Sequence, residues 1–196
     1  MSELVRYAEA EVPTEYGRVR VVVYQVGEER EEHVALVVGD VAAGDAPVLA
    51  RVHSECWTGE VVRSHKCDCR DQLDRAMRNI ANAGRGVVVY MRQEGRGIGL
   101  GNKVRAYALQ NEGVDTVDAN RLLGFADDAR SYDVAADILR DLGVNRVALM
   151  TNNPGKVRGL EAGGIHVAER VALRAEPNEH NAEYLAVKAR KMGHSL

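Results

Sequence analysis

The sequence lacks several features that mark membrane, secreted and repetitive proteins. No window is apolar for long enough to span a membrane, and residues 1–4 contain no basic segment followed by an apolar run. Internal repeats and low-complexity stretches are also missing. We therefore expect neither a membrane-spanning helix nor a secretory leader, and a cytoplasmic protein with no membrane partner.

A large excess of charge of one sign is missing too. The net charge is -3 and the isoelectric point is about 6.1, so a basic surface of the size that binds a polyanionic duplex is not expected. We therefore expect no nucleic-acid partner, whereas small anions remain possible ligands. The 196 residues, 45% of them hydrophobic, are enough for a substantial core and favour a single domain over residues 1–196.

Cysteine is scarce, and all three cysteines fall in one short window, at Cys56, Cys67 and Cys69. In a reducing compartment such thiols favour metal binding over a disulfide. Structural zinc has four protein ligands, whereas hydrolytic zinc has three and a water, so three cysteines predict an open zinc site in an enzyme. Two alternatives remain: the cysteines are small buried hydrophobic residues, or His53 or His65 completes a closed structural site.

Apolar runs predict a sheet. Residues 87–90 and 146–150 are continuous apolar runs, as expected for strands covered on both faces. Residues 19–25 and 33–38 are β-like runs separated by a charged segment, which predicts a hairpin, and residues 48–52 form a further strand.

Helical patterns separate the later strands. Residues 71–83 place apolar side chains on one face and end at Gly84, and a second helix, capped by Ser131, ends at Gly143. Asn153 and Pro154 have the residue types of a helix cap and first turn. This alternation predicts an α/β fold, with a mixed sheet, flanking helices and a β-rich N-terminal part.

Polar residues follow three of the predicted strands, at the edge where α/β sheets bind their ligands. Residues 92–103 contain four glycines among arginines and a lysine, which is typical of a phosphate-binding loop but also of a simple connection. Residues 151–156 offer a hydroxyl, two amides and Lys156, although a turn with a surface lysine would look the same. Arg51, His53 and Glu55 precede Cys56, where Glu55 could also be a solvated charge.

Together these motifs resemble a known family. The segments Arg51-Val52-His53-Ser54-Glu55-Cys56 and Cys67-Asp68-Cys69, residues 92–100 and 103–110, and Leu123-Gly124-Phe125 with Asp128 and Arg130 are similar to GTP cyclohydrolase II of the riboflavin pathway. Residues 151–156 and 184–194 are similar to it as well. Several independent motifs in the family's order make the resemblance specific, and it extends from about residue 5 to the C-terminus.

The resemblance implies a hydrolase whose substrate is GTP. Such an enzyme opens the imidazole ring, releases C8 as formate and removes pyrophosphate, which leaves 2,5-diamino-6-ribosylamino-4(3H)-pyrimidinone 5′-phosphate. The resemblance further implies one Zn²⁺ per subunit at Cys56, Cys67 and Cys69, Mg²⁺ with the triphosphate, a homodimer, and no fused dihydroxybutanone phosphate synthase domain.

The resemblance also implies roles for individual residues. Tyr107 would position water or an intermediate, unless it is a core aromatic; Arg130 would attack the α-phosphate with Asp128 as its base. Because a guanidinium has a pKa above about 12, stabilising transition-state charge is the easier task for Arg130. The implied substrate-binding residues are Arg51, Val52, His53, Ser54, Glu55, Gln72, Glu94, Gly95, Arg96, Thr116, Thr151 and Lys156.

Among these, Glu94 would read guanine, because a carboxylate can accept both the N1–H and the 2-amino group. Its alternative role is a surface ion pair with Arg92 or Arg96. Three residues depart from the family's usual pattern, namely Trp57, Arg70 and Met91. They leave open a paralogue that stops at the formamidopyrimidine or serves secondary metabolism, and a non-catalytic, zinc-stabilised nucleotide-binding module is the third hypothesis.

Overall fold

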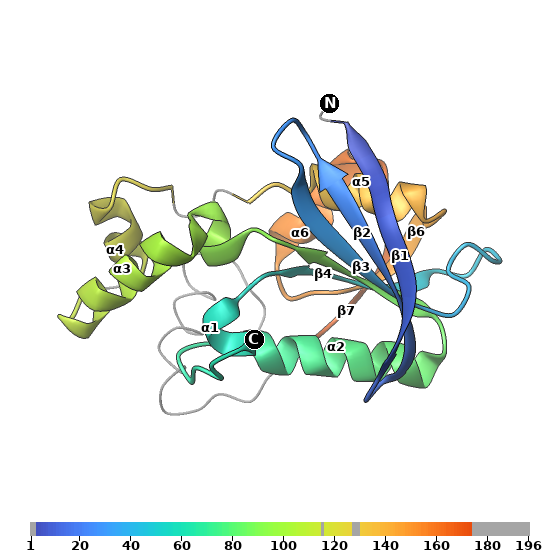
Figure 1. Ribbon diagram of the computed structural model, residues 1–196, viewed down its shortest axis with the longest axis horizontal. Coiled ribbons are helices and arrows are strands. Elements are labelled where there is room, and N and C mark those ends of the chain that lie inside the picture. Colours follow the sequence, from blue (N-terminus) through green and yellow to red (C-terminus); the bar gives the residue numbers. More distant parts are fainter. Residues whose placement is uncertain (1–2, 115, 127–129, 174–196) are drawn as a thin grey trace.

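The computed structural model describes residues 3–114, 116–126 and 130–173. Within these ranges, seven strands form one mixed sheet in the order β1-β2-β3-β5-β4-β6-β7. Helices cover both faces of this sheet, and two further helices project from one side of it (Figure 1). The predicted α/β fold with a mixed sheet, flanking helices and a β-rich N-terminal part is therefore confirmed.

The N-terminal strands β1 (Leu4–Thr14), β2 (Gly17–Val26) and β3 (Glu31–Val38) form an antiparallel meander. The hairpin predicted between the second and third of these strands is confirmed, and its loop contains Gly27 at φ 69. Strand β1 was not predicted, because ten of its eleven residues are exposed and no apolar face distinguishes it. Its position at the sheet edge, paired only with β2 among the described strands, explains that exposure.

The remaining strands are parallel to one another: β4 (Val48–Ser54), β5 (Gly86–Met91), β6 (Arg146–Met150) and β7 (His166–Val171). Five of the six residues of β5 are buried, as predicted for a strand covered on both faces. Ser54 of β4 is in register with Met91 of β5, and Ala50 of β4 is in register with Leu149 of β6. The carboxyl ends of β4, β5 and β6 therefore meet at one edge of the sheet.

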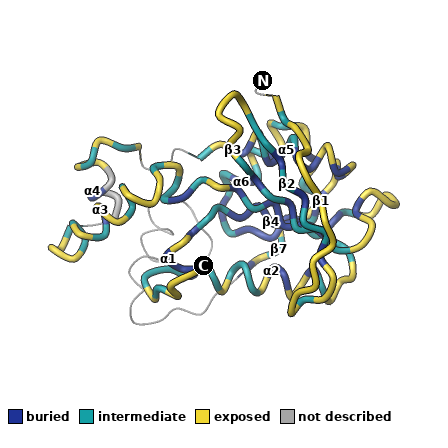
Figure 2. The backbone as a smooth tube through the Cα atoms, in the orientation of Figure 1, coloured by how far each residue is buried: buried dark blue, intermediate teal, exposed yellow. Residues whose placement is uncertain are grey.

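Two separate apolar layers hold the helices on the sheet. Helix α2 (Cys69–Ala83) buries Ala76, Met77 and Ile80 against one face, and α5 (Asp133–Asp141) and α6 (Pro154–Ala162) pack on the other. Figure 2 shows the resulting band of buried backbone through the sheet. Since burial of apolar surface is the dominant favourable term in folding, these two layers fix the sheet edge that carries the polar segments.

The helix ends largely follow the predicted signals. Helix α2 ends at Gly84, which adopts the left-handed conformation at φ 68, and the side chain of Asn153 caps α6 by accepting from the Gly155 amide at 2.8 Å. The predicted Ser131 cap is wrong by one position, because Tyr132 is the N-cap of α5. The Ser131 hydroxyl nevertheless accepts from the Asp133 amide at 3.3 Å.

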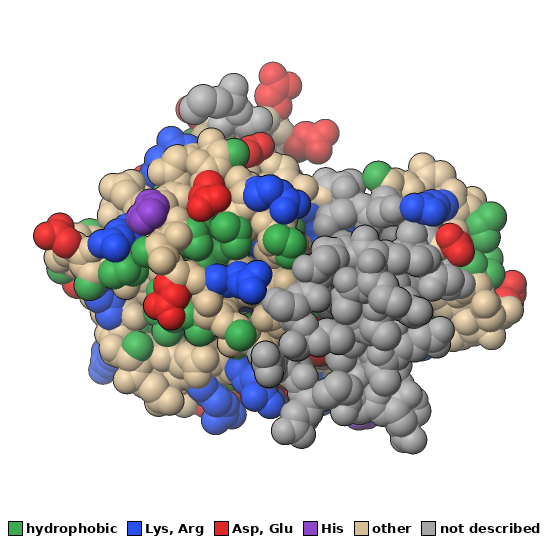
Figure 3. All heavy atoms as spheres, turned by 180° about the vertical axis from the view of Figure 1, so that it is seen from behind, with side chains coloured by type: hydrophobic (Ala, Val, Ile, Leu, Met, Phe, Trp, Pro, Cys, Tyr) green, Lys and Arg blue, Asp and Glu red, His purple; other side chains and the backbone are tan. Residues whose placement is uncertain are grey.

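Four further helical segments belong to the described residues. They are α1 (Trp57–Glu60), the 3-10 turn η1 (Glu94–Gly97), α3 (Gly99–Asn111) and α4 (Thr116–Leu122). Helices α3 and α4 pack on each other away from the sheet (Figure 1). Over the described residues, no helix has the length and apolar character needed to cross a membrane. Figure 3 shows basic and acidic side chains interspersed on the visible described surface.

Candidate active site and metal centre

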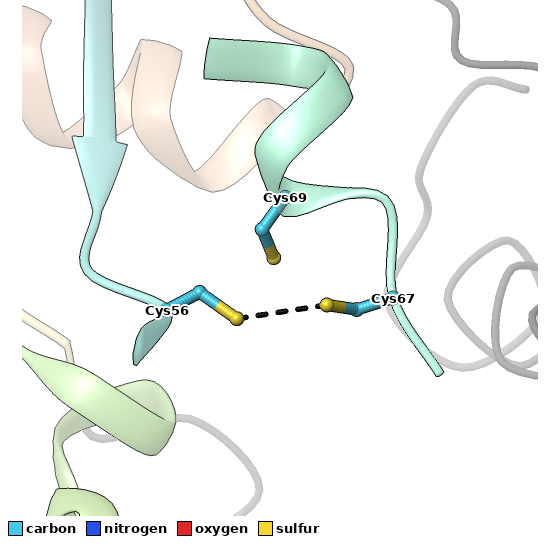
Figure 4. A group of neighbouring side chains, drawn as sticks. All are labelled: Cys56, Cys67 and Cys69. Carbon is cyan, nitrogen blue, oxygen red and sulfur yellow. Dashed lines mark hydrogen bonds between the residues drawn. The ribbon is translucent and has the colours of Figure 1, made fainter. Parts of the chain in front are cut away.

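The three cysteines converge, although they come from two segments. Cys56 follows β4 and precedes α1, whereas Cys67 lies in the loop before α2 and Cys69 is the first residue of α2. The three side chains point toward one another (Figure 4). The three sulfur atoms lie within 4.8 Å of one another, and Cys56 Sγ is 3.6 Å from Cys67 Sγ. Tetrahedral zinc with bonds of about 2.3 Å places its sulfurs about 3.8 Å apart, so the cluster fits that ion.

Neither histidine belongs to this cluster. His53 Nε2 is 2.9 Å from Glu60 Oε1, and His65 is exposed. Among the described residues, the group of potential ligands here consists of Cys56, Cys67 and Cys69. The alternative of a site closed by histidine therefore finds no support, and the donor set leaves room for a fourth ligand from outside the protein.

Hydrogen bonds distribute protons unevenly among the thiols. Bonds from Cys67 and Cys69 lower the pKa of Cys56, and Lys103 adds to this effect. The pKa of Cys67 is raised to about 11, mainly by its bond to Cys56, and that of Cys69 is raised for the same reason and by burial. Without metal the cluster thus favours one thiolate, at Cys56, and metal binding would displace protons from the others.

A cleft opens beside the cluster at the carboxyl edge of β4, β5 and β6. It encloses about 1020 Å³ of empty space, its open mouth included. The cleft lies at the strand ends, where the sequence predicted a ligand site. The predicted site residues that line the cleft are Arg51, His53, Ser54, Glu55, Cys56, Cys69, Gln72, Glu94, Gly95, Arg96, Tyr107, Arg130, Thr151 and Lys156.

Four predicted site residues do not line it in the described structure. Cys67 belongs to the cysteine cluster, and Val52 lies in the sheet core, where its carbonyl oxygen accepts from Lys156 Nζ at 2.8 Å. Thr116 begins α4, but its side chain lies outside the described residues, as does the whole of Asp128.

Two cations are buried in the cleft wall. The side chain of Arg51 donates to Met150 O at 2.9 Å and to Gln72 Oε1 at 2.5 Å, and burial lowers the pKa of Arg51 to about 10. Lys156 is only 5% exposed, so the alternative of a surface lysine is wrong. Arg51 Nε and His53 Nδ1 are buried and have no hydrogen-bond partner among the described residues, although both side chains line the cleft. A bound ligand would satisfy such atoms.

Glu94 is buried and already engaged. Its Oε2 accepts from the Trp57 amide at 2.6 Å, and its Oε1 accepts from the Gly95 amide at 2.6 Å and from Lys103 Nζ at 2.8 Å. The alternative of a surface ion pair with an arginine is therefore wrong, because the side chain is 8% exposed and pairs with Lys103. A carboxylate has about four acceptor sites, and three are in use, so one remains for a ligand. Displacement of a backbone amide would free another.

Tyr107 and Glu55 both face the cleft. The Tyr107 hydroxyl is hydrogen-bonded to Thr58, and burial raises the pKa of Tyr107 to about 12, so the hydroxyl stays protonated at neutral pH. The core-aromatic alternative does not hold for this half-buried side chain. Glu55 is partly buried, with Arg92 Nε 3.8 Å from its carboxylate, so it is more than a solvated charge.

The three residues that depart from the family pattern, Trp57, Arg70 and Met91, do not line the cleft. Arg70 Nη1 donates to Glu60 O at 3.0 Å and Arg70 Nε is 3.5 Å from Asp74, so its guanidinium links α2 to α1. Met91 is buried in the sheet core, and the Trp57 side chain is 42% exposed. None of the three is among the described residues that line the cleft.

The implied site residues did not include several residues of the cleft. Lys103 lies 3.1 Å from Cys56 Sγ, and Asn152, Asn153 and Gln110 also line the cleft. Lys103 could have been found, because it precedes Tyr107 by four positions on a predicted helix and therefore shares its face.

Comparison with known proteins identifies the family. The profile described as GTP cyclohydrolase II matches residues 5–172. GTP cyclohydrolase-2 of Pasteurella multocida (strain Pm70) is 53% identical over 196 residues, which cover 100% of this chain and 90% of the relative. GTP cyclohydrolase-2 of Histophilus somni (strain 2336) is 54% identical over 196 residues with the same coverage.

Two further similarities cover only part of the other protein. Riboflavin biosynthesis protein RibBA of Bacillus subtilis (strain 168) is 53% identical over 191 residues, which cover 97% of this chain and 48% of that protein. A solved structure of a two-domain 3,4-dihydroxy-2-butanone 4-phosphate synthase from A. baumannii has a TM-score of 0.47 and 22% identity over 88% of this chain and 40% of that chain, a similarity too low to bear on function. On the strength of the family profile and of the full-length relatives, the chain belongs to the GTP cyclohydrolase II family, the hydrolases of riboflavin biosynthesis.

Proposed function

We propose that this chain hydrolyses GTP at C8 of guanine, with release of formate and pyrophosphate, to give 2,5-diamino-6-ribosylamino-4(3H)-pyrimidinone 5′-phosphate. The observation that carries the proposal is the open cluster of Cys56, Cys67 and Cys69 at the wall of a cleft that also contains buried cations and a buried carboxylate. The names of the full-length relatives support the same reaction.

Zinc is the metal that the donor set fits, and Cys56, Cys67 and Cys69 would hold it. When bound, zinc supplies Lewis acidity that lowers the pKa of water toward neutrality, which makes hydroxide available to an electrophilic carbon. Tyr107 would position the attacked group through its protonated hydroxyl, which lies in the same cleft and bonds to Thr58 beside Cys56. Such a donor stabilises developing negative charge on oxygen.

Recognition of guanine falls to Glu94 in this proposal. The carboxylate has one acceptor site left for a purine donor, and it gains a second if the adjacent Gly95 amide turns away. Adenine offers neither the N1–H nor the 2-amino group, so it would leave the buried carboxylate partly unpaired. GTP would thereby be favoured over ATP.

The triphosphate requires positive charge. Arg51, Arg130 and Lys156 line the cleft, and Mg²⁺ bound to the phosphates would complete the neutralisation. The family's pattern assigns Arg130 as nucleophile toward the α-phosphate and Asp128 as its base. A guanidinium is rarely deprotonated, so Arg130 can stabilise the charge of the transition state more easily than it can act as a nucleophile. Both versions predict that pyrophosphate release is lost in Arg130→Ala.

The proposal is tested by incubating the purified protein with GTP, Mg²⁺ and Zn²⁺ and identifying every small product by mass spectrometry. We expect formate, pyrophosphate and the diaminopyrimidine. Cys67→Ser should lose formate release by more than about 1000-fold, since metal assistance contributes several kcal/mol, while its far-UV circular dichroism stays unchanged. His65→Ala is the matched control, because His65 is exposed and outside the cluster, and it should retain both zinc and activity.

Other products would identify the remaining hypotheses. A formamidopyrimidine nucleotide as the end product would indicate a paralogue with altered chemistry. Binding of GTP without any product, together with unfolding of Cys67→Ser, would indicate a nucleotide-binding module that zinc stabilises, and would contradict the proposed function.

A further inference from the structure

Lys103 bridges two parts of the site that lie far apart in the sequence. Its ammonium is 3.1 Å from Cys56 Sγ and 2.8 Å from Glu94 Oε1, and the side chain is only 12% exposed. The ring of Tyr107, one turn further along α3, lies 5.8 Å from the same ammonium. One buried cation therefore contacts the cysteine cluster and the carboxylate that faces the cleft, and lies near the ring of Tyr107.

The partners of Lys103 explain how a lysine is accommodated in this buried position. Its ammonium donates to the Glu94 carboxylate and to the Cys56 sulfur, so the cost of burying its charge is offset by groups on two separate segments. If the three cysteines bind a metal as thiolates, their combined charge exceeds that of one divalent ion, and the ammonium lies beside this excess.

We propose that Lys103 is a positioning residue that joins the metal-binding thiolate of Cys56 to the purine-reading carboxylate of Glu94. This inference rests on the proposed function. The ammonium holds Glu94 at a fixed distance from the cysteine cluster, so a purine bound to Glu94 presents its five-membered ring in one orientation. The hydrogen bond to Cys56 also withdraws electron density from the sulfur, which offsets the weakening of a metal's Lewis acidity by three thiolates.

A purely structural ion pair predicts different behaviour. If Lys103 only stabilised the packing of α3, its removal would lower the free energy of unfolding and leave the electronic state of the sulfur unchanged. A positioning role changes the sulfur's donor strength and the rate at C8 in a protein that is still folded. The two roles are therefore separated by spectroscopy of the metal-loaded protein and by kinetics.

The first test uses Lys103→Met, which keeps an unbranched side chain of nearly the same length and removes the charge. In the protein loaded with Co²⁺ as a probe, the sulfur-to-metal charge-transfer band should move to longer wavelength, because an unbonded thiolate is the stronger donor. Formate release from GTP should fall about 10- to 100-fold, the usual loss when a residue supporting a metal ligand is removed. The thermal unfolding midpoint of each variant shows that it is folded.

Lys66→Met is the matched control. Lys66 Nζ also lies against the Tyr107 ring, 5.1 Å from its centroid. Its hydrogen bond, however, goes to Oδ1 of Asn111 in α3, at 2.7 Å. This substitution removes a lysine from the same aromatic ring without touching the sulfur of Cys56. Its Co²⁺ spectrum and its rate of formate release should match those of the unmodified protein.

Two further variants test the link itself. Lys103→Arg retains the charge and the donors and should recover part of the band position. Glu94→Gln, made alone and combined with Lys103→Met, forms a double-mutant cycle, and residues that act as one unit lose less in the double variant than the product of the two single losses. If Lys103→Met does not fold, Lys103→Arg and Lys103→Gln, which keeps a donor without the charge, provide the comparison.

The proposal is overturned if Lys103→Met or Lys103→Gln leaves the charge-transfer band in place and formate release within about twofold, or if the losses in the cycle multiply independently. These outcomes are distinct from failure of the proposed function. In that case the unmodified protein itself releases no formate from GTP, while the band position still reports on the contact between Lys103 and Cys56.

Discussion

Gly59 lies so close to Cys67 that no side chain fits between them. A Cβ atom placed on Gly59 would lie 2.9 Å from Cys67 Sγ and 3.2 Å from Cys56 Sγ. Carbon and sulfur rarely approach to such distances, so the backbone of α1 forms one wall of the cysteine cluster. A glycine in a short helix, which costs stability relative to alanine, thus has a reason in the geometry of the thiols.

Gly59→Ala should therefore weaken zinc binding by about 10- to 100-fold, because the new methyl group displaces the sulfurs. Competition with a chelator measures this affinity. Gly101→Ala is the matched control, since a Cβ at Gly101 in α3 meets nothing within 4 Å. That control should raise the free energy of unfolding by roughly 0.5–1 kcal/mol and leave zinc affinity unchanged. Equal zinc affinities in both variants would contradict the prediction.

Arg70→Ala should alter stability and leave the product unchanged. Arg70 donates to Glu60 O at 3.0 Å and so ties the segment of Cys69 to that of Cys56, but it does not line the cleft. Loss of this hydrogen bond costs about 0.5–1.5 kcal/mol, which urea unfolding measures. Accumulation of a formamidopyrimidine by Arg70→Ala, detected by mass spectrometry, would show that Arg70 influences the chemistry after all.

Tyr107→Phe should slow formate release by about 100-fold, the effect of losing one donor in a buried site. Its zinc content should not change, because the hydroxyl bonds to Thr58 and is not a member of the cysteine cluster. Since burial raises the pKa of Tyr107 to about 12, the pH profile of the unmodified protein should show no ionisation of this residue near neutrality. A rate for Tyr107→Phe equal to that of the unmodified protein would remove Tyr107 from the site.

The Asp141 carboxylate should make the free energy of unfolding depend on pH in the acidic range. Burial acts to raise the pKa of Asp141, but hydrogen bonds from Tyr24 at 2.6 Å and from Arg6 outweigh it and lower that pKa below the usual 3.8. A carboxylate with a lowered pKa stabilises the folded state above its unfolded pKa, and this contribution disappears as the pH falls through the folded pKa.

The difference in unfolding free energy between the unmodified protein and Asp141→Asn should thus be largest at neutral pH and vanish in strong acid. The side chain is 38% exposed, so solvent screening limits the difference to about 1 kcal/mol or less. Urea unfolding at a series of pH values measures it. A difference that stays constant over the whole series would contradict the assignment.

Several elements of the fold could be predicted because their signals are local. The buried strand β5 has a continuous apolar run, α2 ends at Gly84, and the cap Asn153 precedes Pro154 at the start of α6. Strand β1 could not be predicted, since its side chains are largely exposed and its existence depends on pairing with β2. The predicted cap of α5 was wrong by one residue, because Tyr132 is the N-cap, although the hydroxyl that accepts from the Asp133 amide belongs to Ser131.

The sequence by itself determined the chemical inventory of this protein: three cysteines that could bind a metal, polar residues after successive strands, and motifs of one enzyme family. Residue type and spacing are sufficient for that, because donor chemistry and helix or strand periodicity are local properties.

Only the tertiary structure decided which of these residues meet. Packing of α1, α2 and α3 around the strand ends excludes both histidines from the cluster, buries Glu94, directs Arg70 away from the cleft and places Lys103 between Cys56 and Glu94. The contacts made by Lys103 link residues that lie 9 to 47 positions apart in the sequence. These contacts, and the exclusion of the two histidines from the cluster, depend on how the apolar layers pack rather than on any local pattern.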